Sequence, residues 1–147
     1  VFGGMRLMGE GLVAAYAAQG AASVVAAALV GFVWRRQLSL PIRAAALAAA
    51  TSVAAPLILF YDFMIIAVAM TWLVRAARED GFLPWEKTAM LVLFPVPLLS
   101  RHAAMIWHAP LGTLASLAFL ALVFAVARRE IARHSARAEP ALLSLPA

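Results

Sequence analysis

The sequence predicts an all-α fold, a polytopic transmembrane bundle of about five helices. Of the 147 residues, 65% are hydrophobic and only 13% are charged, and the mean hydropathy is +0.93. Soluble domains are closer to half apolar and a quarter charged. A soluble chain of this length buries about 70% of its surface on folding, which would leave too much apolar surface in water. We therefore expect lipid to cover the remainder.

Uncharged stretches divide the chain into candidate spans, because a membrane helix needs about 20 mostly apolar residues. The first stretch is rich in Ala, Gly and Ser, which let helices approach closely in lipid. The stretch 44–74 carries one charge and would be about 46 Å long as a single helix, longer than a hydrocarbon core of about 30 Å. Pro56 also interrupts it, so we expect two short spans there. The expected spans are about 12–34, 44–59, 62–77, 88–107 and 111–128.

Proline and charge mark the remaining boundaries. Pro95 and Pro97 should kink the fourth span, and the chain should turn near 108–110. Residues 1–130 would form the transmembrane region. Residues 131–147 would form a basic cytoplasmic tail, disordered toward its end.

Three basic clusters predict the topology. The clusters 35–43, 75–87 and 128–137 hold ten of the twelve Lys and Arg. Basic residues collect in cytoplasmic loops, and two expected spans separate each cluster from the next. This places the amino terminus outside and the carboxyl terminus in the cytoplasm. The net charge of +5 therefore fits a membrane protein, and we expect no nucleic-acid partner.

Four polar residues are the candidates for substrate binding. Asp62, beside Tyr61, interrupts an apolar stretch, and an acid there is a functional candidate by default. The alternative is that Asp62 is only the N-cap of the third span. Arg101 and His102 lie in the outer part of the fourth span, where Arg101 can bind phosphate or simply reach lipid headgroups. The chain has no cysteine, no metal-binding spacing and no phosphate loop, so we expect neither metal nor cofactor.

Six stretches in order carry a family resemblance. They are Val1-Phe2-Gly3-Gly4-Met5-Arg6-Leu7-Met8-Gly9, Trp34-Arg35-Arg36, Arg43-Ala44-Ala45-Ala46-Leu47-Ala48-Ala49-Ala50-Thr51, Ala55-Pro56, Tyr61-Asp62 and Gly81-Phe82-Leu83-Pro84-Trp85-Glu86-Lys87. Over about residues 1–128, this series resembles the carboxy-terminal portion of bacterial glycosyltransferase family 87, the polyprenol-phosphate-mannose-dependent mannosyltransferases. The chain also opens at Val1 without an initiator Met, and we expect it to be part of a longer protein.

The resemblance implies a GT-C-type mannosyltransferase of the bacterial inner membrane. Its polyprenyl-phosphate sugar donor would bind on the extracytoplasmic side. The usual catalytic base in this family is an Asp of an early external loop, which matches no position here, so no catalytic residue is assigned. The missing amino-terminal part of the same protein would be a partner, and the chain alone should transfer no sugar.

A non-catalytic membrane protein is the rival hypothesis, as a transporter fragment or a helical scaffold subunit. Such proteins place polar groups around a midplane cavity, often between broken helices. Gln19 and Thr71 are the only other polar residues that suit such a position.

Overall fold

The computed structural model describes residues 1–56 and 64–143, and within these ranges the chain is helical with no strand. The all-α prediction is therefore confirmed for the described residues. The helices are α1 (Phe2–Leu7), α2 (Leu12–Arg35), α3 (Leu40–Ala54), α4 (Met64–Asp80), α5 (Glu86–Leu93), α6 (Val96–Trp107) and α7 (Leu111–Leu143).

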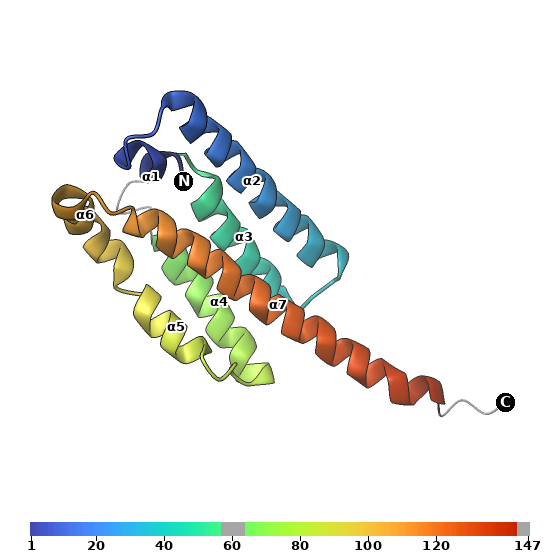
Figure 1. Ribbon diagram of the computed structural model, residues 1–147. Coiled ribbons are helices and arrows are strands. Elements are labelled where there is room, and N and C mark those ends of the chain that lie inside the picture. Colours follow the sequence, from blue (N-terminus) through green and yellow to red (C-terminus); the bar gives the residue numbers. More distant parts are fainter. Residues whose placement is uncertain (57–63, 144–147) are drawn as a thin grey trace.

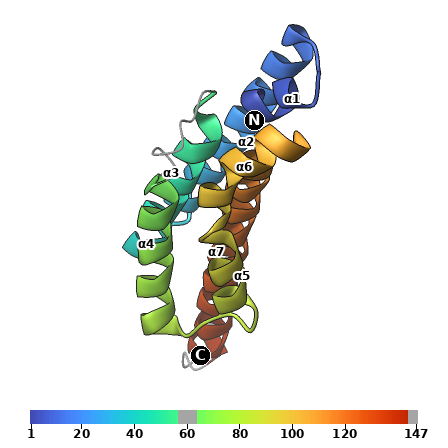
Figure 2. The ribbon, with the colours of Figure 1, turned by 90° about the vertical axis from the view of Figure 1, so that its left-hand side faces the viewer.

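Helix α3 is the centre of the bundle. It packs against α2, α4 and α7, while α6 and α5 lie against α7 and α1 packs on α2 and the start of α7 (Figure 1). Its buried positions include four alanines, which allow the neighbouring backbones to come close: Ala45, Ala46, Ala49 and Ala50. Helix α1 lies at one end of the bundle and the carboxy-terminal part of α7 at the other (Figure 2).

Two described helices are long and apolar enough to cross a membrane. They are α2 and the segment Leu111–Ala136 of α7, and a third crossing results if α5 and α6 count as one bent span. Helix α3 has 15 residues, a length of about 22 Å, which is less than a hydrocarbon core of about 30 Å. A membrane protein is therefore supported by two helices, whereas five crossings go beyond what these lengths show.

The helix boundaries differ modestly from the expected spans. Helix α3 begins four residues before the expected 44, because Ser39 is its N-cap and Pro41 fits its first turn. It ends at Ala54, where Ala55 is extended before Pro56. The expected junction of the second and third spans, with Tyr61 and Asp62, lies outside the described residues.

The predicted kink in the fourth span is confirmed. The segments Glu86–Leu93 and Leu98–Trp107 meet at 62°. Pro95 has no N–H for the helical hydrogen bond to the carbonyl four residues earlier, so the helix breaks there. The predicted turn near 108–110 is also confirmed, since His108 ends α6 in the left-handed conformation, with φ of 50°.

Helix α7 differs most from the prediction. The expected span ends near 128 and is followed by a basic tail that is disordered toward its end, whereas the helix continues to Leu143. One contact explains why the first turns beyond 128 are ordered: Arg133 Nη1 donates to the Asp80 carbonyl at 2.6 Å. The tail is therefore partly a packing element of the bundle.

Candidate functional site

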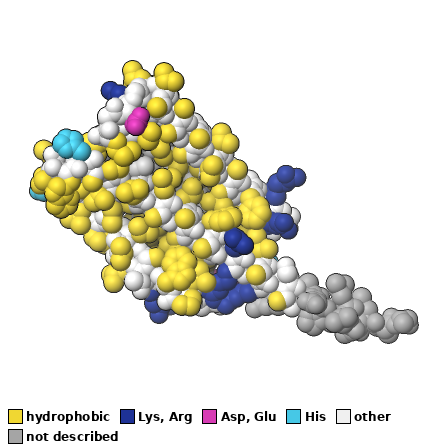
Figure 3. Space-filling model, in the orientation of Figure 1, with side chains coloured by type: hydrophobic (Ala, Val, Ile, Leu, Met, Phe, Trp, Pro, Cys, Tyr) yellow, Lys and Arg dark blue, Asp and Glu magenta, His cyan; other side chains and the backbone are white. Residues whose placement is uncertain are grey.

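The three basic clusters meet at one end of the bundle, which we call the basic end. Ser39, within the first cluster, bonds to Glu130 in the third, and Arg129 of the third bonds to Gly81 in the second. Figure 3 shows Lys and Arg side chains gathered toward the end where α7 leaves the bundle. The clusters therefore share one end of the bundle, as the topology prediction requires.

Side chains of α7 complete two helix ends at the basic end. The Glu130 carboxylate accepts from Ser39 N at 2.7 Å and from Ser39 Oγ at 2.9 Å, at the amino end of α3. Arg129 Nη2 and Nη1 donate to the carbonyls of Asp80 and Gly81, both at 2.8 Å, at the carboxyl end of α4. Each charge has the sign that the helix dipole favours. This end is thus a structural clamp that joins α3, α4 and α7.

Glu86 is a fully buried acid at the same end. Its Oε2 accepts from Leu83 N at 2.8 Å and so fixes the entry into α5. Its Oε1 has no hydrogen-bond partner within the described chain, and the adjoining cavity is only about 10 Å³. Such a cavity holds about one water. The cavity beside Glu86 is therefore too small for a substrate.

Gln19 joins three helices at the opposite end. Its Nε2 donates to the carbonyls of Val53 and Ala54, at 3.0 and 2.9 Å, where α3 ends. Its Oε1 accepts from Phe2 N at 2.9 Å, where α1 begins. One neutral amide therefore serves the carboxyl end of one helix and the amino end of another.

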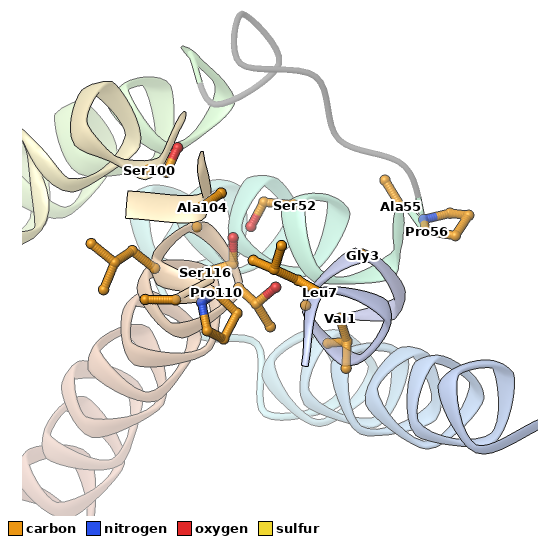
Figure 4. A pocket seen from close by; sticks show the side chains of 15 residues that line it. Val1, Gly3, Leu7, Ser52, Ala55, Pro56, Ser100, Ala104, Pro110 and Ser116 are labelled. Atoms are coloured by element: carbon orange, nitrogen blue, oxygen red, sulfur yellow. The ribbon is translucent and has the colours of Figure 1, made fainter. Parts of the chain in front are cut away.

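A pocket of about 280 Å³ opens beside Gln19, and we call this end the pocket end. Its walls come from α1, the end of α3, α6 and the start of α7 (Figure 4). Gly4 of α1 fits tightly against α7, because a Cβ built on Gly4 would lie 2.6 Å from Thr113 Oγ1. A small residue at position 4 is thus needed for the wall of the pocket to close.

Four hydroxyl side chains line this pocket: Ser52, Ser100, Thr113 and Ser116. Ser52 Oγ donates to the Ala49 carbonyl at 2.8 Å, and Ser52 and Ser116 point into the same space in Figure 4. Ser116 is 4% exposed, and neither it nor Thr113 forms a hydrogen bond within the described residues. Hydroxyls in an otherwise apolar pocket suit a ligand that is itself rich in hydroxyls.

The predicted site residues are only partly placed by the structure. Arg101 and His102 are exposed on α6 and do not line the pocket, although their neighbour Ser100 does. Tyr61 and Asp62 lie outside the described residues; Pro56, shortly before them, lines the pocket. Gln19 is buried as expected, whereas Thr71 is exposed and bonds to Val68 of its own helix.

Sequence reasoning missed the pocket hydroxyls and Gly4. Ser and Thr are common in membrane helices, and no local pattern distinguishes Thr113 and Ser116 from the other hydroxyls of the chain. No family model, curated protein or solved structure matches the chain. In the part of the chain that the structure describes, no three His, Asp or Glu side chains converge as metal ligands.

Proposed function

We propose that this chain is a membrane region of a glycosyltransferase that uses a polyprenyl-phosphate sugar, with mannose as the first candidate. The observation that carries the proposal is the hydroxyl-lined pocket at the end of the bundle away from the basic clusters. The ordered resemblance to family 87 gives the pocket its substrate class. A sugar presents several hydroxyls, which can bond to Thr113 and Ser116.

The proposed topology has five crossings, formed by α2, α3, α4, the bent α5–α6 pair and α7. The basic end would face the cytoplasm and the pocket end the extracytoplasmic side of a bacterial inner membrane. What supports this arrangement is that all three basic clusters lie at one end of the bundle. The chain has no cysteine, so single Cys variants can report the topology. A Cys at position 79, where the side chain is exposed at the basic end, should resist external labelling, and labelling there would contradict the layout.

In the proposed reaction, a carboxylate acts as general base on the acceptor hydroxyl, which attacks the anomeric carbon as the donor phosphate leaves. No described residue that lines the pocket carries a carboxylate, so the base would come from another part of the enzyme. Tyr61, Asp62, Arg101 and His102 remain candidates for substrate binding. Glu10 is exposed in the turn before α2, and we do not assign it the role of base.

The test is sugar transfer by the intact enzyme from a radiolabelled polyprenyl-phosphate mannose donor. Thr113→Val with Ser116→Ala should lower kcat/KM about tenfold or more, since each lost ligand hydrogen bond contributes about 1 kcal/mol. Thr71→Val is the matched control, because Thr71 is exposed and bonds only to its own helix. If the pocket variants are as active as this control, the pocket does not bind the sugar. If the intact enzyme transfers no hexose from any polyprenyl-phosphate donor, the proposed function is wrong.

A second measurement concerns Asp62. Asp62→Asn keeps an N-cap of similar strength, so a cap alone predicts unchanged transfer. Loss of transfer at unchanged expression would assign a functional charge to Asp62.

The non-catalytic alternative has one supporting feature, the bent α5–α6 pair, which resembles the broken helices of transporters. The polar groups that it needs at a midplane cavity are not paired there in the described residues. Gln19 bonds to helix ends and Thr71 to its own helix, so the transferase is the better-supported proposal.

A further inference from the structure

An apolar groove runs between α2 and α7 on the outside of the bundle. Its volume is about 450 Å³, and its lining is entirely apolar. The walls come from both helices: Val25, Ala28 and Phe32 from α2, and Leu117, Ala121 and Phe124 from α7. Figure 3 shows hydrophobic side chains over much of the face that carries these two helices. The groove follows about 10 Å of α2, a length that part of an extended acyl chain can fill.

The groove continues into a second hollow at the basic end. This hollow shares Ala28 and Phe32 with the groove and reaches Arg35 and Arg36. The continuous depression is therefore apolar along its length and basic at one end.

Two aromatic rings line the groove near its basic end, and each has a guanidinium group over it. The rings of Phe32 and Phe124 lie 6.2 Å apart between centroids and connect α2 to α7. The Arg36 guanidinium lies 5.7 Å from the centre of the Phe32 ring, and the Arg128 guanidinium lies 5.9 Å from that of Phe124. Phe32 and Phe124 thus connect the two helices here, and an arginine lies against each ring.

Arg36 and Arg128 differ from Arg129 and Arg133 of α7 in their partners. Arg133 is paired with Asp80, and Arg129 is bonded to backbone carbonyls. Within the described residues, by contrast, no carboxylate lies in ion-pair contact with Arg36 or Arg128. Guanidinium groups that stack on rings keep N–H donors at their edges, in the geometry that binds phosphate oxygens.

We propose that this groove binds one anionic phospholipid, with an acyl chain between α2 and α7 and its phosphate between Arg36 and Arg128. Charge decides among the possible occupants. An apolar helix would fill the groove but leave both guanidinium groups without an anion, whereas a lipid of negative net charge matches both parts. The lipid site lies at the end opposite the pocket, so the proposal does not depend on the transferase function.

The experiment is native mass spectrometry of the purified chain after exchange in mixed micelles with equal amounts of phosphatidylglycerol and phosphatidylcholine of the same acyl chains. The wild-type chain should retain one phosphatidylglycerol in preference to phosphatidylcholine. The double variant Arg36→Gln with Arg128→Gln should lose this preference, by about fivefold for each arginine removed. Arg36→Lys with Arg128→Lys, which keeps both charges, should retain most of it and shows that the fold tolerates changes here.

Two further double variants distinguish the contribution of the lipid headgroup to binding from that of the acyl chain. Arg75→Gln with Arg78→Gln removes the same charge from α4 at the basic end, away from the groove, and should bind phosphatidylglycerol like the wild type. Ala28→Leu with Ala121→Leu fills the groove without changing charge and should lower the retention of phosphatidylglycerol several-fold. The proposal is overturned if the Gln variant of Arg36 and Arg128 binds like the wild type or if the filled groove retains lipid unchanged. A wild-type spectrum showing dimers without lipid, or equal retention of both lipids, also overturns it.

Discussion

The basic end and the pocket end of the bundle both satisfy the backbone groups of helix ends, but with different side chains. A helix end inside an apolar bundle leaves backbone groups without hydrogen-bond partners. At the basic end, Glu130 and Arg129 supply full charges to the ends of α3 and α4. At the pocket end, the neutral amide of Gln19 serves the ends of α3 and α1. Helix α3 is thus held at both of its ends by side chains of other helices.

This difference separates residues that hold the fold from residues available to a ligand. At the basic end, Glu130, Arg129 and Arg133 are bonded to helix termini, and the cavity beside Glu86 holds about one water. At the pocket end, Gln19 forms the hydrogen bonds that join the helices. The hydroxyls of Thr113 and Ser116 form no hydrogen bond within the described residues. Stability and binding should therefore respond to different substitutions.

The largest effect is expected for Glu130→Ala. This change removes two charge-assisted hydrogen bonds and leaves Ser39 N without its partner. Such bonds contribute about 1.5–3 kcal/mol each, and we expect a loss of about 3 kcal/mol in the free energy of unfolding. The measurement is unfolding by sodium dodecyl sulfate in mixed micelles, followed by circular dichroism.

The matched control for Glu130 is Glu79→Ala, at the same end. The Glu79 side chain is 61% exposed and its contact with Arg75 is 3.9 Å long, so its loss should change stability by less than about 0.5 kcal/mol. Glu130→Gln keeps an acceptor for Ser39 N and should fall between the two. Equal stability of all three variants would mean that the clamp at the basic end does not hold the bundle.

Gln19→Leu should have the second largest effect. Leu has a similar volume but cannot bond to the carbonyls at the end of α3 or to Phe2 N. Unsatisfied backbone groups cost about 1–3 kcal/mol, so the expected loss is about 2 kcal/mol by the same unfolding measurement. Hydrogen exchange should rise at residues 2–5 more than at the basic end. A uniform change along the chain would contradict a local role for Gln19.

A pair of neighbouring glycines tests the wall of the pocket. A Cβ at position 4 meets Thr113 and Pro110, whereas one at position 3 meets nothing within 4 Å. Gly4→Ala should destabilise by about 1–2 kcal/mol through overpacking, and Gly3→Ala should be neutral or slightly stabilising in a helix. If the two alanine variants unfold alike, α1 does not pack on α7 as the structure has it.

The sequence predicted the helices better than their roles. Hydropathy placed α2 within one residue and proline placed the break before Val96, because both signals are local. Hydropathy could not show that α3 is central, since an apolar helix looks the same whether lipid or protein covers it. The side chains that cap α3 could not be predicted from local sequence patterns either, because Glu130 is 91 residues from Ser39 and Gln19 is 34 residues from Val53. The contact of Arg133 with Asp80, which holds α7 beyond the expected end of its span, joins residues 53 positions apart and has no local signal either.

The smallest effect is expected where the pocket hydroxyls are removed. Ser116 is nearly buried and makes no hydrogen bond within the described residues, so Ser116→Ala removes no partner from any other group. The loss of an unpaired buried hydroxyl should be neutral or slightly stabilising, within about 0.5 kcal/mol, and Thr113→Val should behave alike.

Ser39→Ala is the control for the stability of the pocket variants Ser116→Ala and Thr113→Val. Ser39 is the N-cap of α3, and its Oγ donates to Glu130 at 2.9 Å, so its removal should cost about 1–2 kcal/mol. The same unfolding titration measures all three variants. If Ser116→Ala cost as much as Ser39→Ala, the pocket hydroxyl would be part of the fold, and a loss of sugar transfer in the pocket variant could not be assigned to a lost ligand contact. If stability is unchanged while transfer falls, the hydroxyl acts on the ligand, because nothing in the described bundle depends on it.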